Sequence, residues 1–244
     1  MYSHRDHTDY NSSMTKYLGI IGYPLGHSVS PVFQQAALDY LGIDARYLLW
    51  PTQPNRLSEQ MRLLTNGEVL GANVTIPYKE AVIPYLDTIS DLARRVAAVN
   101  TLVNRNGVLH GYNTDVAGFM RAMEDGGKFN PAGKRALIIG AGGASKAVAL
   151  ALLDANIASL TVANRTLSRA EALVESLPGD MNANARPLTE ATLATSGGWD
   201  LVINTTSVGM AGSDAEGQSP IPAQLIPRDA LIVDIVYNPT DTPL

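Results

Sequence analysis

The chain has 244 residues, enough for one large domain or two modest ones with a sizeable core. The formal net charge is −5 and no basic run occurs, which argues against a nucleic-acid-binding protein. The chain has no cysteine, which excludes disulfides and thiolate sites. The chain contains no stretch of about 18 apolar residues, the length that predicts a membrane-spanning helix. We expect a cytoplasmic protein without a membrane contact or a metal site.

The first part of the chain alternates short apolar strands with helices. Residues 1–16 are polar and are predicted to form a disordered leader. The segment Asn104-Arg105-Asn106-Gly107 is typical of a hairpin turn. Apolar spacing and glycine or proline boundaries predict strands at 17–22, 45–50, 71–76, 98–103 and 108–111, and helices at 32–41, 57–64 and 79–85.

The second part begins with a predicted linking helix at 116–124 and then repeats the strand–helix alternation. Continuous apolar strands between helices indicate a parallel sheet covered on both faces. We therefore predict an α/β fold with two α/β domains, at 17–113 and 114–244, and a cleft between them. The expected strands here are 135–139, 160–163, 201–204 and 231–234, and the expected helices are 144–155 and 168–176.

A glycine-rich loop, Gly140-Ala141-Gly142-Gly143-Ala144, directly follows one of these strands and begins a helix. Glycines let the backbone approach a pyrophosphate, and the helix N-terminus offers free N–H groups. The sixth position of the G-x-G-x-x-G pattern is Ser145, which is small enough for close packing of helix and strand. The alternative is a strand-to-helix turn without a ligand. The context favours a Rossmann dinucleotide-binding domain.

The end of the next predicted strand indicates which dinucleotide is bound. An acidic residue near this point would accept the ribose hydroxyls of NAD. The sequence instead reads Asn164-Arg165-Thr166-Leu167-Ser168-Arg169. Guanidinium groups and a hydroxyl suit a 2′-phosphate, so the segment favours NADP over NAD. The alternative is that Arg165 and Arg169 lie at a helix N-terminus and bind no ligand, a placement of positive charge that the helix dipole disfavours.

Several polar segments lie at the ends of predicted elements in the first domain. Singly, each has an ordinary explanation: Ser28 or Asp115 as a helix cap, Asn100 in a turn, Lys79 in solvent. Lys79 is placed in the first turn of a predicted helix, against the macrodipole, which suggests another purpose. Together these segments supply the donors, the amine and the carboxylate that suit a small polyhydroxylated acid: Ser28, Ser30, Asn73, Thr75, Lys79, Asn100 and Asp115.

With these motifs the chain resembles the shikimate dehydrogenase family. The matching motifs run in family order over nearly the whole chain. They are Gly-His-Ser-Val-Ser-Pro (26–31), Asn-Val-Thr-Ile-Pro-Tyr-Lys (73–79), Ala-Val-Asn-Thr-Leu (98–102), Asn-Thr-Asp (113–115), Gly-Ala-Gly-Gly-Ala (140–144), Asn-Arg-Thr-Leu-Ser-Arg (164–169), Asn-Thr-Thr-Ser-Val-Gly-Met (204–210) and Asp-Ile-Val-Tyr-Asn-Pro (234–239).

The resemblance implies NADPH-dependent, reversible reduction of 3-dehydroshikimate to shikimate in aromatic amino-acid biosynthesis. Residues 17–113 would bind the substrate and 114–244 NADP, in a monomer or homodimer with small-molecule partners only. Lys79 and Asp115 would be catalytic, and which of them carries the proton is open. Substrate contacts would come from Ser28, Ser30, Asn73, Thr75, Asn100 and Tyr237. The cofactor side would add Asp91, Thr205, Thr206, Ser207 and Ile235 to the glycine loop and the arginine segment.

The resemblance leaves two alternative functions open. The chain ends at Leu244, whereas family members continue into a tail with a glycine-rich turn and a helix, so we expect weakened substrate binding and an exposed apolar surface. The alternatives are a quinate/shikimate dehydrogenase and a non-catalytic, truncated NADP-binding relative. The segment after Asn164 argues against the first. Retention of both Lys79 and Asp115 argues against the second, whereas the missing tail argues for it.

Overall fold

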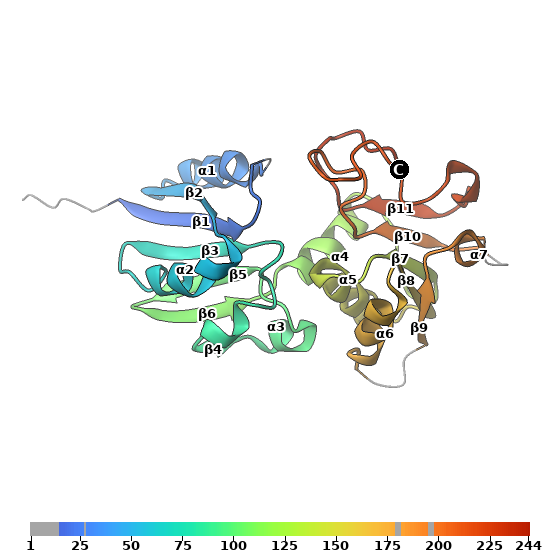
Figure 1. Cartoon of the computed structure of the whole chain (residues 1–244), viewed down its shortest axis with the longest axis horizontal. Helices are drawn as coiled ribbons and strands as arrows, with labels where there is room; N and C mark the ends of the chain where they lie inside the picture. Colours follow the sequence, from blue (N-terminus) through green and yellow to red (C-terminus); the bar gives the residue numbers. More distant parts are fainter. Residues whose placement is uncertain (1–14, 27, 179–181, 195–197) are drawn as a thin grey trace, which may run out of the picture.

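The computed structural model of the chain shows two lobes side by side, each built on its own β-sheet (Figure 1). It describes residues 15–26, 28–178, 182–194 and 198–244. The predicted leader lies outside the described residues up to residue 14, and Lys16 already begins the first strand. Within the described residues, no helix is long and apolar enough to cross a membrane.

The first lobe contains a six-stranded sheet in the order β2-β1-β3-β5-β6-β4. The three strands β2, β1 and β3 are parallel, whereas β5 runs antiparallel to both of its neighbours. The elements are β1 (Lys16–Gly22), α1 (Ser30–Tyr40), β2 (Ala45–Pro51), α2 (Leu57–Leu63), β3 (Val69–Val74), β4 (Thr88–Ile89), α3 (Asp91–Val96), β5 (Thr101–Arg105) and β6 (Val108–Tyr112).

Residue alternation along these strands separates the two faces of the sheet. Ile21 and Val74 pack on one face with α2, whereas Ile20 and Tyr47 pack on the other. The predicted hairpin between β5 and β6 is confirmed. Its turn residues Asn106 and Gly107 have φ of 55° and 88°, the left-handed conformations that this tight turn requires.

The predicted helix at 79–85 is wrong. The chain makes turns there, followed by a single 3₁₀ turn at Ile83–Tyr85. The carbonyl of Lys79 accepts a hydrogen bond from the Val99 N–H at 2.7 Å instead of one from within a helix, and Pro84 has no N–H to donate. Lys79 is therefore held next to Asn100 by a contact distant in sequence. Lys79 is not in the first turn of a helix, so no helix dipole acts against it there.

The second lobe contains a five-stranded sheet in the order β11-β10-β7-β8-β9, and all its neighbouring pairs are parallel, as predicted. The chain reverses the direction of strand order between β7 and β10, the position where such sheets bind ligands. The elements are α4 (Asp115–Asp125), β7 (Arg135–Ile139), α5 (Gly143–Asp154), β8 (Ser159–Asn164), α6 (Leu167–Glu175), β9 (Ala183–Pro187), α7 (Glu190–Leu193), β10 (Leu201–Asn204) and β11 (Leu231–Asp234).

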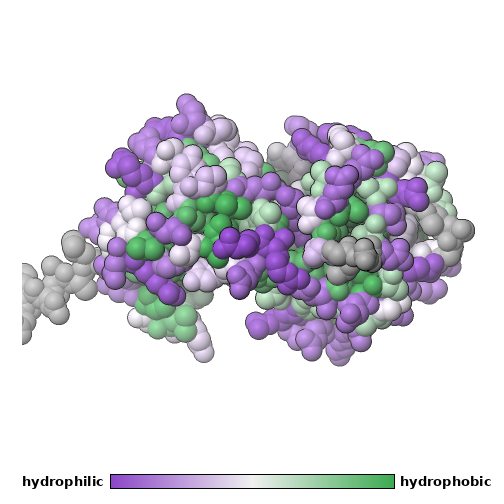
Figure 2. All heavy atoms as spheres, turned by 90° about the horizontal axis from the view of Figure 1, so that it is seen from below, coloured by the Kyte–Doolittle hydropathy of each residue, from purple (hydrophilic) through white to green (hydrophobic). Residues whose placement is uncertain are grey.

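Helix α5 connects the cores of the two lobes. Eight of its residues are buried, and it contacts α4 and also α3 of the first lobe. At its far end Arg95 of α3 forms a bidentate ion pair with Asp154, with N–O distances of 2.6 and 3.2 Å. Seen from below, the surface narrows between the lobes, and hydrophilic side chains gather there (Figure 2). Over the described residues the chain passes between the lobes once, just before Asp115.

Helix α1 leaves most of its apolar residues uncovered. The sequence placed Val32, Phe33 and Tyr40 at helical spacing, and the helix forms as predicted. These side chains are nevertheless exposed, Tyr40 by 90%, and Leu41 beyond the helix is exposed as well. The helix is attached to the sheet mainly through Leu38 and through Gln35, whose amide bonds the backbone of Ala45 and Tyr47.

Candidate active site

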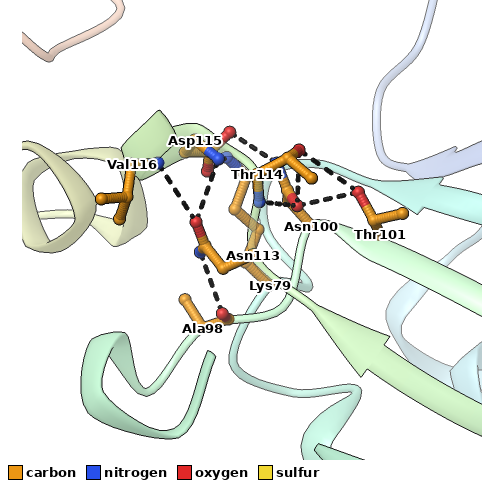
Figure 3. A network of polar contacts seen from close by, with 8 residues as sticks. All are labelled: Lys79, Ala98, Asn100, Thr101, Asn113, Thr114, Asp115 and Val116. Carbon is orange, nitrogen blue, oxygen red and sulfur yellow. Dashed lines mark hydrogen bonds and ion pairs between the residues drawn. The ribbon is translucent and has the colours of Figure 1, made fainter. Parts of the chain in front are cut away.

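Lys79 and Asp115 form an ion pair at the point where the chain leaves the first lobe (Figure 3). The Nζ–Oδ2 distance is 2.6 Å, and the two side chains are only 17% and 29% exposed. Lys79 comes from the turn after β3, and Asp115 begins α4, where a carboxylate is favoured by the helix dipole. The two residues are 36 positions apart in sequence, so the fold brings together the amine and the carboxylate that the sequence predicted as a pair.

Asn100 holds the other oxygen of this carboxylate. Its Nδ2 donates to Asp115 Oδ1 at 2.6 Å and to Thr114 Oγ1 at 2.9 Å, and its Oδ1 accepts from the Thr114 N–H and from Thr101 Oγ1, each at 2.9 Å. Both ends of the amide are thus engaged within the protein (Figure 3). Asn100 orients Asp115 whether or not it also contacts a substrate.

Asn113 fixes the backbone that carries Asp115. It is 5% exposed, its Nδ2 donates to the carbonyl of Ala98, and its Oδ1 accepts from the N–H groups of Asp115 and Val116. The side chain therefore acts as an N-terminal cap for α4 and joins it to the segment before Asn100. The sequence alone predicted no separate role for Asn113. Its place two residues before Asp115, a common capping offset, was the available signal.

The stem of Lys79 lies over the glycine loop of the second lobe. A Cβ placed on Gly143 would be 3.6 Å from Lys79 Cδ, an ordinary contact distance, so the lysine stem packs directly beside this glycine. Next to it, Glu80 forms an ion pair with Lys146 in the first turn of α5, at 2.9 Å. The ion pair of Lys79 and Asp115 therefore adjoins the predicted phosphate loop.

One side of the glycine loop contacts Thr205, and the other side has no atom of the described residues close to it. Gly140 has a φ of +112°, and a Cβ there would lie 2.6 Å from Thr205 Oγ1. Ser145 is fully buried; its hydroxyl accepts from the Gly142 N–H and bonds Thr205 Oγ1 at 2.6 Å. A Cβ on Gly142, in contrast, would meet no atom within 4 Å. The loop thus has space in front of Gly142 and the free N–H groups of an α5 N-terminus, which fits the pyrophosphate of a dinucleotide.

The segment after β8 is cationic and unpaired. Arg165, Thr166 and Arg169 are exposed at the start of α6, and neither arginine forms an ion pair with a residue that the structure describes. Asn164 donates from Nδ2 to the carbonyl of Thr166 at 2.9 Å, which shapes the turn. The first turn of α6 contains no acidic residue. Two guanidinium groups and a helix N-terminus therefore face solvent together, as a 2′-phosphate site requires.

The remaining predicted substrate residues lie on both lobes. Ser30 begins α1 and is buried, and its N–H lies 3.4 Å from Ser28 Oγ. Asn73 is the penultimate residue of β3, and Thr75 falls just beyond the strand, although its N–H still bonds the carbonyl of Ile21. Tyr237 follows β11 in the second lobe and is 61% exposed.

The remaining predicted cofactor residues are partly used by the fold. Thr205 Oγ1 donates to the carbonyl of Ile139, and Thr206 Oγ1 donates to Asn204 Oδ1. Their hydroxyls thus support the loop beside Gly140. Ser207 follows them, Ile235 follows β11 and packs partly against the core, and Asp91 is exposed at the first position of α3.

Comparison with known proteins gives the family. The family profile described as the shikimate dehydrogenase substrate binding domain matches residues 20–102, and that described as shikimate / quinate 5-dehydrogenase matches residues 125–241. The protein named shikimate dehydrogenase (NADP(+)) from Halothermothrix orenii is 45% identical over 235 residues, which cover 94% of this chain and 81% of that protein. The chain belongs to the shikimate dehydrogenase family.

Solved structures of shikimate dehydrogenases share the fold. That of the Thermus thermophilus enzyme in complex with NADP(H) and shikimate has a TM-score of 0.79 and 38% identity, covering 92% of this chain and 80% of that one. That of the Listeria monocytogenes enzyme in complex with shikimate and NAD has a TM-score of 0.83 and 31% identity, covering 97% and 83%. The predicted fold class, an α/β substrate domain followed by a Rossmann domain, is thus confirmed.

Proposed function

We propose that the chain is an NADP-dependent oxidoreductase that reversibly reduces 3-dehydroshikimate to shikimate, a step of aromatic amino-acid biosynthesis, with Lys79 and Asp115 as its catalytic pair. The observation that carries the residue assignment is the 2.6 Å ion pair between them, next to the glycine loop. Family membership supports the reaction. We assign substrate binding to residues 17–113 and NADP binding to 114–244, in a cytoplasmic monomer or homodimer.

Reduction of the substrate adds a hydride to the carbonyl carbon and a proton to the carbonyl oxygen. NADPH, when bound, supplies the hydride. The Lys79 ammonium donates a hydrogen bond to the developing alkoxide and stabilises its charge. The proton comes from Lys79 and Asp115 as a coupled pair, and Asn100 keeps the carboxylate in place through its second oxygen. In the reverse direction the pair accepts the proton from the hydroxyl.

The polar groups around the pair suit a substrate with a carboxylate and several hydroxyls. We assign substrate contacts to the residues predicted from the sequence: Ser28, Ser30, Asn73, Thr75, Asn100 and Tyr237. We assign cofactor contacts to Asp91, Gly140, Ala141, Gly142, Gly143, Ala144, Asn164, Arg165, Thr166, Arg169, Thr205, Thr206, Ser207 and Ile235. The unpaired arginines of α6 support NADP rather than NAD.

The test is the rate of NADPH oxidation with 3-dehydroshikimate, with quinate included in the reverse-direction panel to measure strictness. Lys79→Ala should lower kcat by roughly 100- to 10,000-fold, as expected for loss of an acid–base group. Lys134→Ala is the control, because Lys134 lies before β7, at the end of that strand opposite to the glycine loop. An unchanged kcat in Lys79→Ala would show that the catalytic assignment is wrong.

A further inference from the structure

A hydrogen bond crosses one strand of the first sheet. Tyr47 in β2 is in register with Leu18 of β1, and Asn73 in β3 is in register with Ile20 of the same strand. The Tyr47 hydroxyl reaches over β1 and donates to Asn73 Oδ1 at 2.6 Å. Tyr47 is 6% exposed and packs with Ile20 and Leu25, so its ring is fixed by the core.

In the structure this bond engages the carbonyl end of the Asn73 amide. An asparagine side chain presents an acceptor and a donor of nearly equal shape, and a tyrosine hydroxyl can pair with either of them; here it donates to the acceptor. The Tyr47 hydroxyl occupies the acceptor. The Nδ2 donor has no hydrogen-bond partner among the residues that the structure describes. The free end of Asn73 is therefore an N–H donor.

The free donor lies on the sheet face that leads to the catalytic pair. Asn73 and Thr101 oppose each other in the antiparallel pairing of β3 and β5, so their side chains share a face. Thr101 Oγ1 donates to Asn100 Oδ1, and Asn100 holds Asp115 (Figure 3). Polar groups thus continue from Asn73 to Asp115 along one face.

We propose that Tyr47 is a positioning residue that determines specificity. It holds the Asn73 amide so that an N–H donor, not a carbonyl, meets the substrate, which selects a hydroxyl or carboxylate oxygen there. The inference rests on the assignment of Asn73 to the substrate site in the proposed function. Burial raises the pKa of Tyr47 well above its usual value, so the phenol remains a donor at neutral and moderately alkaline pH.

The experiment compares Tyr47→Phe, Asn73→Ala and the double variant. Tyr47→Phe keeps the ring and removes only the hydroxyl. We expect a rise of roughly five- to tenfold in both the KM and the Kd of shikimate, the size of one lost hydrogen bond, with kcat and the Kd of NADP within about twofold. Asn73→Ala should have a similar effect, and the double variant should add little, because Tyr47 acts on the substrate only through the Asn73 amide.

Tyr78→Phe is the control for loss of a buried hydroxyl in this lobe, because Tyr78 donates to the carbonyl of Thr52. It should lower Tm and leave the Kd of shikimate unchanged. If Tyr47→Phe likewise lowers Tm and leaves the Kd of shikimate unchanged, the role of Tyr47 is structural and the proposal is wrong. If Asn73→Ala leaves the Kd unchanged, the proposal fails together with the Asn73 assignment. The Kd needs no turnover, so failure of the catalytic assignment of Lys79 is seen separately.

Discussion

Glu80 and Lys146 join the two lobes through an ion pair of 2.9 Å. Glu80 directly follows Lys79, for which we propose a catalytic role, and Lys146 lies in the first turn of α5, after the glycine loop. A lysine in this turn opposes the helix dipole, and the carboxylate of Glu80 offsets that cost. The pair therefore ties the turn that carries Lys79 to the loop that adjoins it.

Loss of this pair should weaken catalysis more than stability. Glu80 is 55% exposed, so the pair contributes at most about 1 kcal/mol to folding. We expect Glu80→Gln and Lys146→Met each to lower kcat/KM by roughly two- to fivefold with little change in Tm. Steady-state kinetics and thermal unfolding measure both, and exchange of the two charges should restore part of the rate.

Arg95→Gln is the matched control for this prediction, because Arg95 pairs with Asp154 at the far end of the same helix. It should leave kcat/KM within about twofold of the parent. If Lys146→Met weakens NADPH binding while Glu80→Gln strengthens it, Lys146 binds the cofactor directly and the Glu80–Lys146 pair has no positioning role.

Replacement by alanine should affect stability at one glycine of the phosphate loop and NADPH binding at another. Gly140→Ala places a Cβ 2.6 Å from Thr205 Oγ1 at a φ of +112°, so we expect a loss of roughly 1–3 kcal/mol in the free energy of unfolding. Gly142→Ala meets no protein atom and should keep Tm, but its methyl group occupies the space in front of the loop. Denaturant unfolding and NADPH titration separate the two. Equal NADPH affinity in Gly142→Ala and the parent would contradict our placement of the pyrophosphate.

Arg165 and Arg169 should determine the preference for NADP over NAD. Removal of one charge-assisted contact to a 2′-phosphate costs roughly tenfold or more in affinity. Arg165→Ala and Arg169→Ala should therefore raise the Kd of NADP and leave that of NAD unchanged, which titration by fluorescence measures. A parent chain that binds NAD as tightly as NADP would refute the interpretation of this segment.

Two buried tyrosines should make the fold sensitive to alkali. Burial raises the pKa of Tyr47 and Tyr78 above the model-peptide value of 10.0. The folded chain then retains phenolic protons that the unfolded chain loses, so the free energy of unfolding falls as pH rises above about 10. Tyr47→Phe should reduce this fall between pH 8 and about 11, as measured by urea unfolding. The control is Tyr40→Phe, because Tyr40 is exposed. If Tyr40→Phe reduced the fall in the free energy of unfolding as much as Tyr47→Phe, burial of the tyrosine would not be its cause.

The elements of the second lobe were largely predictable from local patterns. The strands β7, β10 and β11 have the predicted bounds, because parallel strands covered on both faces appear as continuous apolar runs. The short elements α7 and β9 were not predicted, since neither has such a run. The helix predicted at 79–85 failed because a backbone bond from Val99, which local periodicity does not encode, captures the carbonyl of Lys79.

The residue types at the site were predictable from the sequence, but the side chains that position them were not. The amine, carboxylate and amide of the pair lie in recognisable motifs. Tyr47, however, lies 26 residues from Asn73, and Ser145 lies 60 residues from Thr205, so only the folded chain shows these contacts. The apolar spacing of α1 predicted the helix correctly, yet it could not tell that this face is left uncovered by the described residues.

Over the described residues the chain crosses between the lobes once, just before Asp115. The proposed catalytic pair therefore lies at this crossing, where a rotation of one lobe against the other about the crossing produces the smallest displacement. The arginine segment of α6 lies on the second lobe and the exposed face of α1 on the first, both away from this crossing (Figure 1). Sequence changes at the crossing could thus alter the reach between cofactor and substrate during evolution while the proton-transfer geometry stays the same.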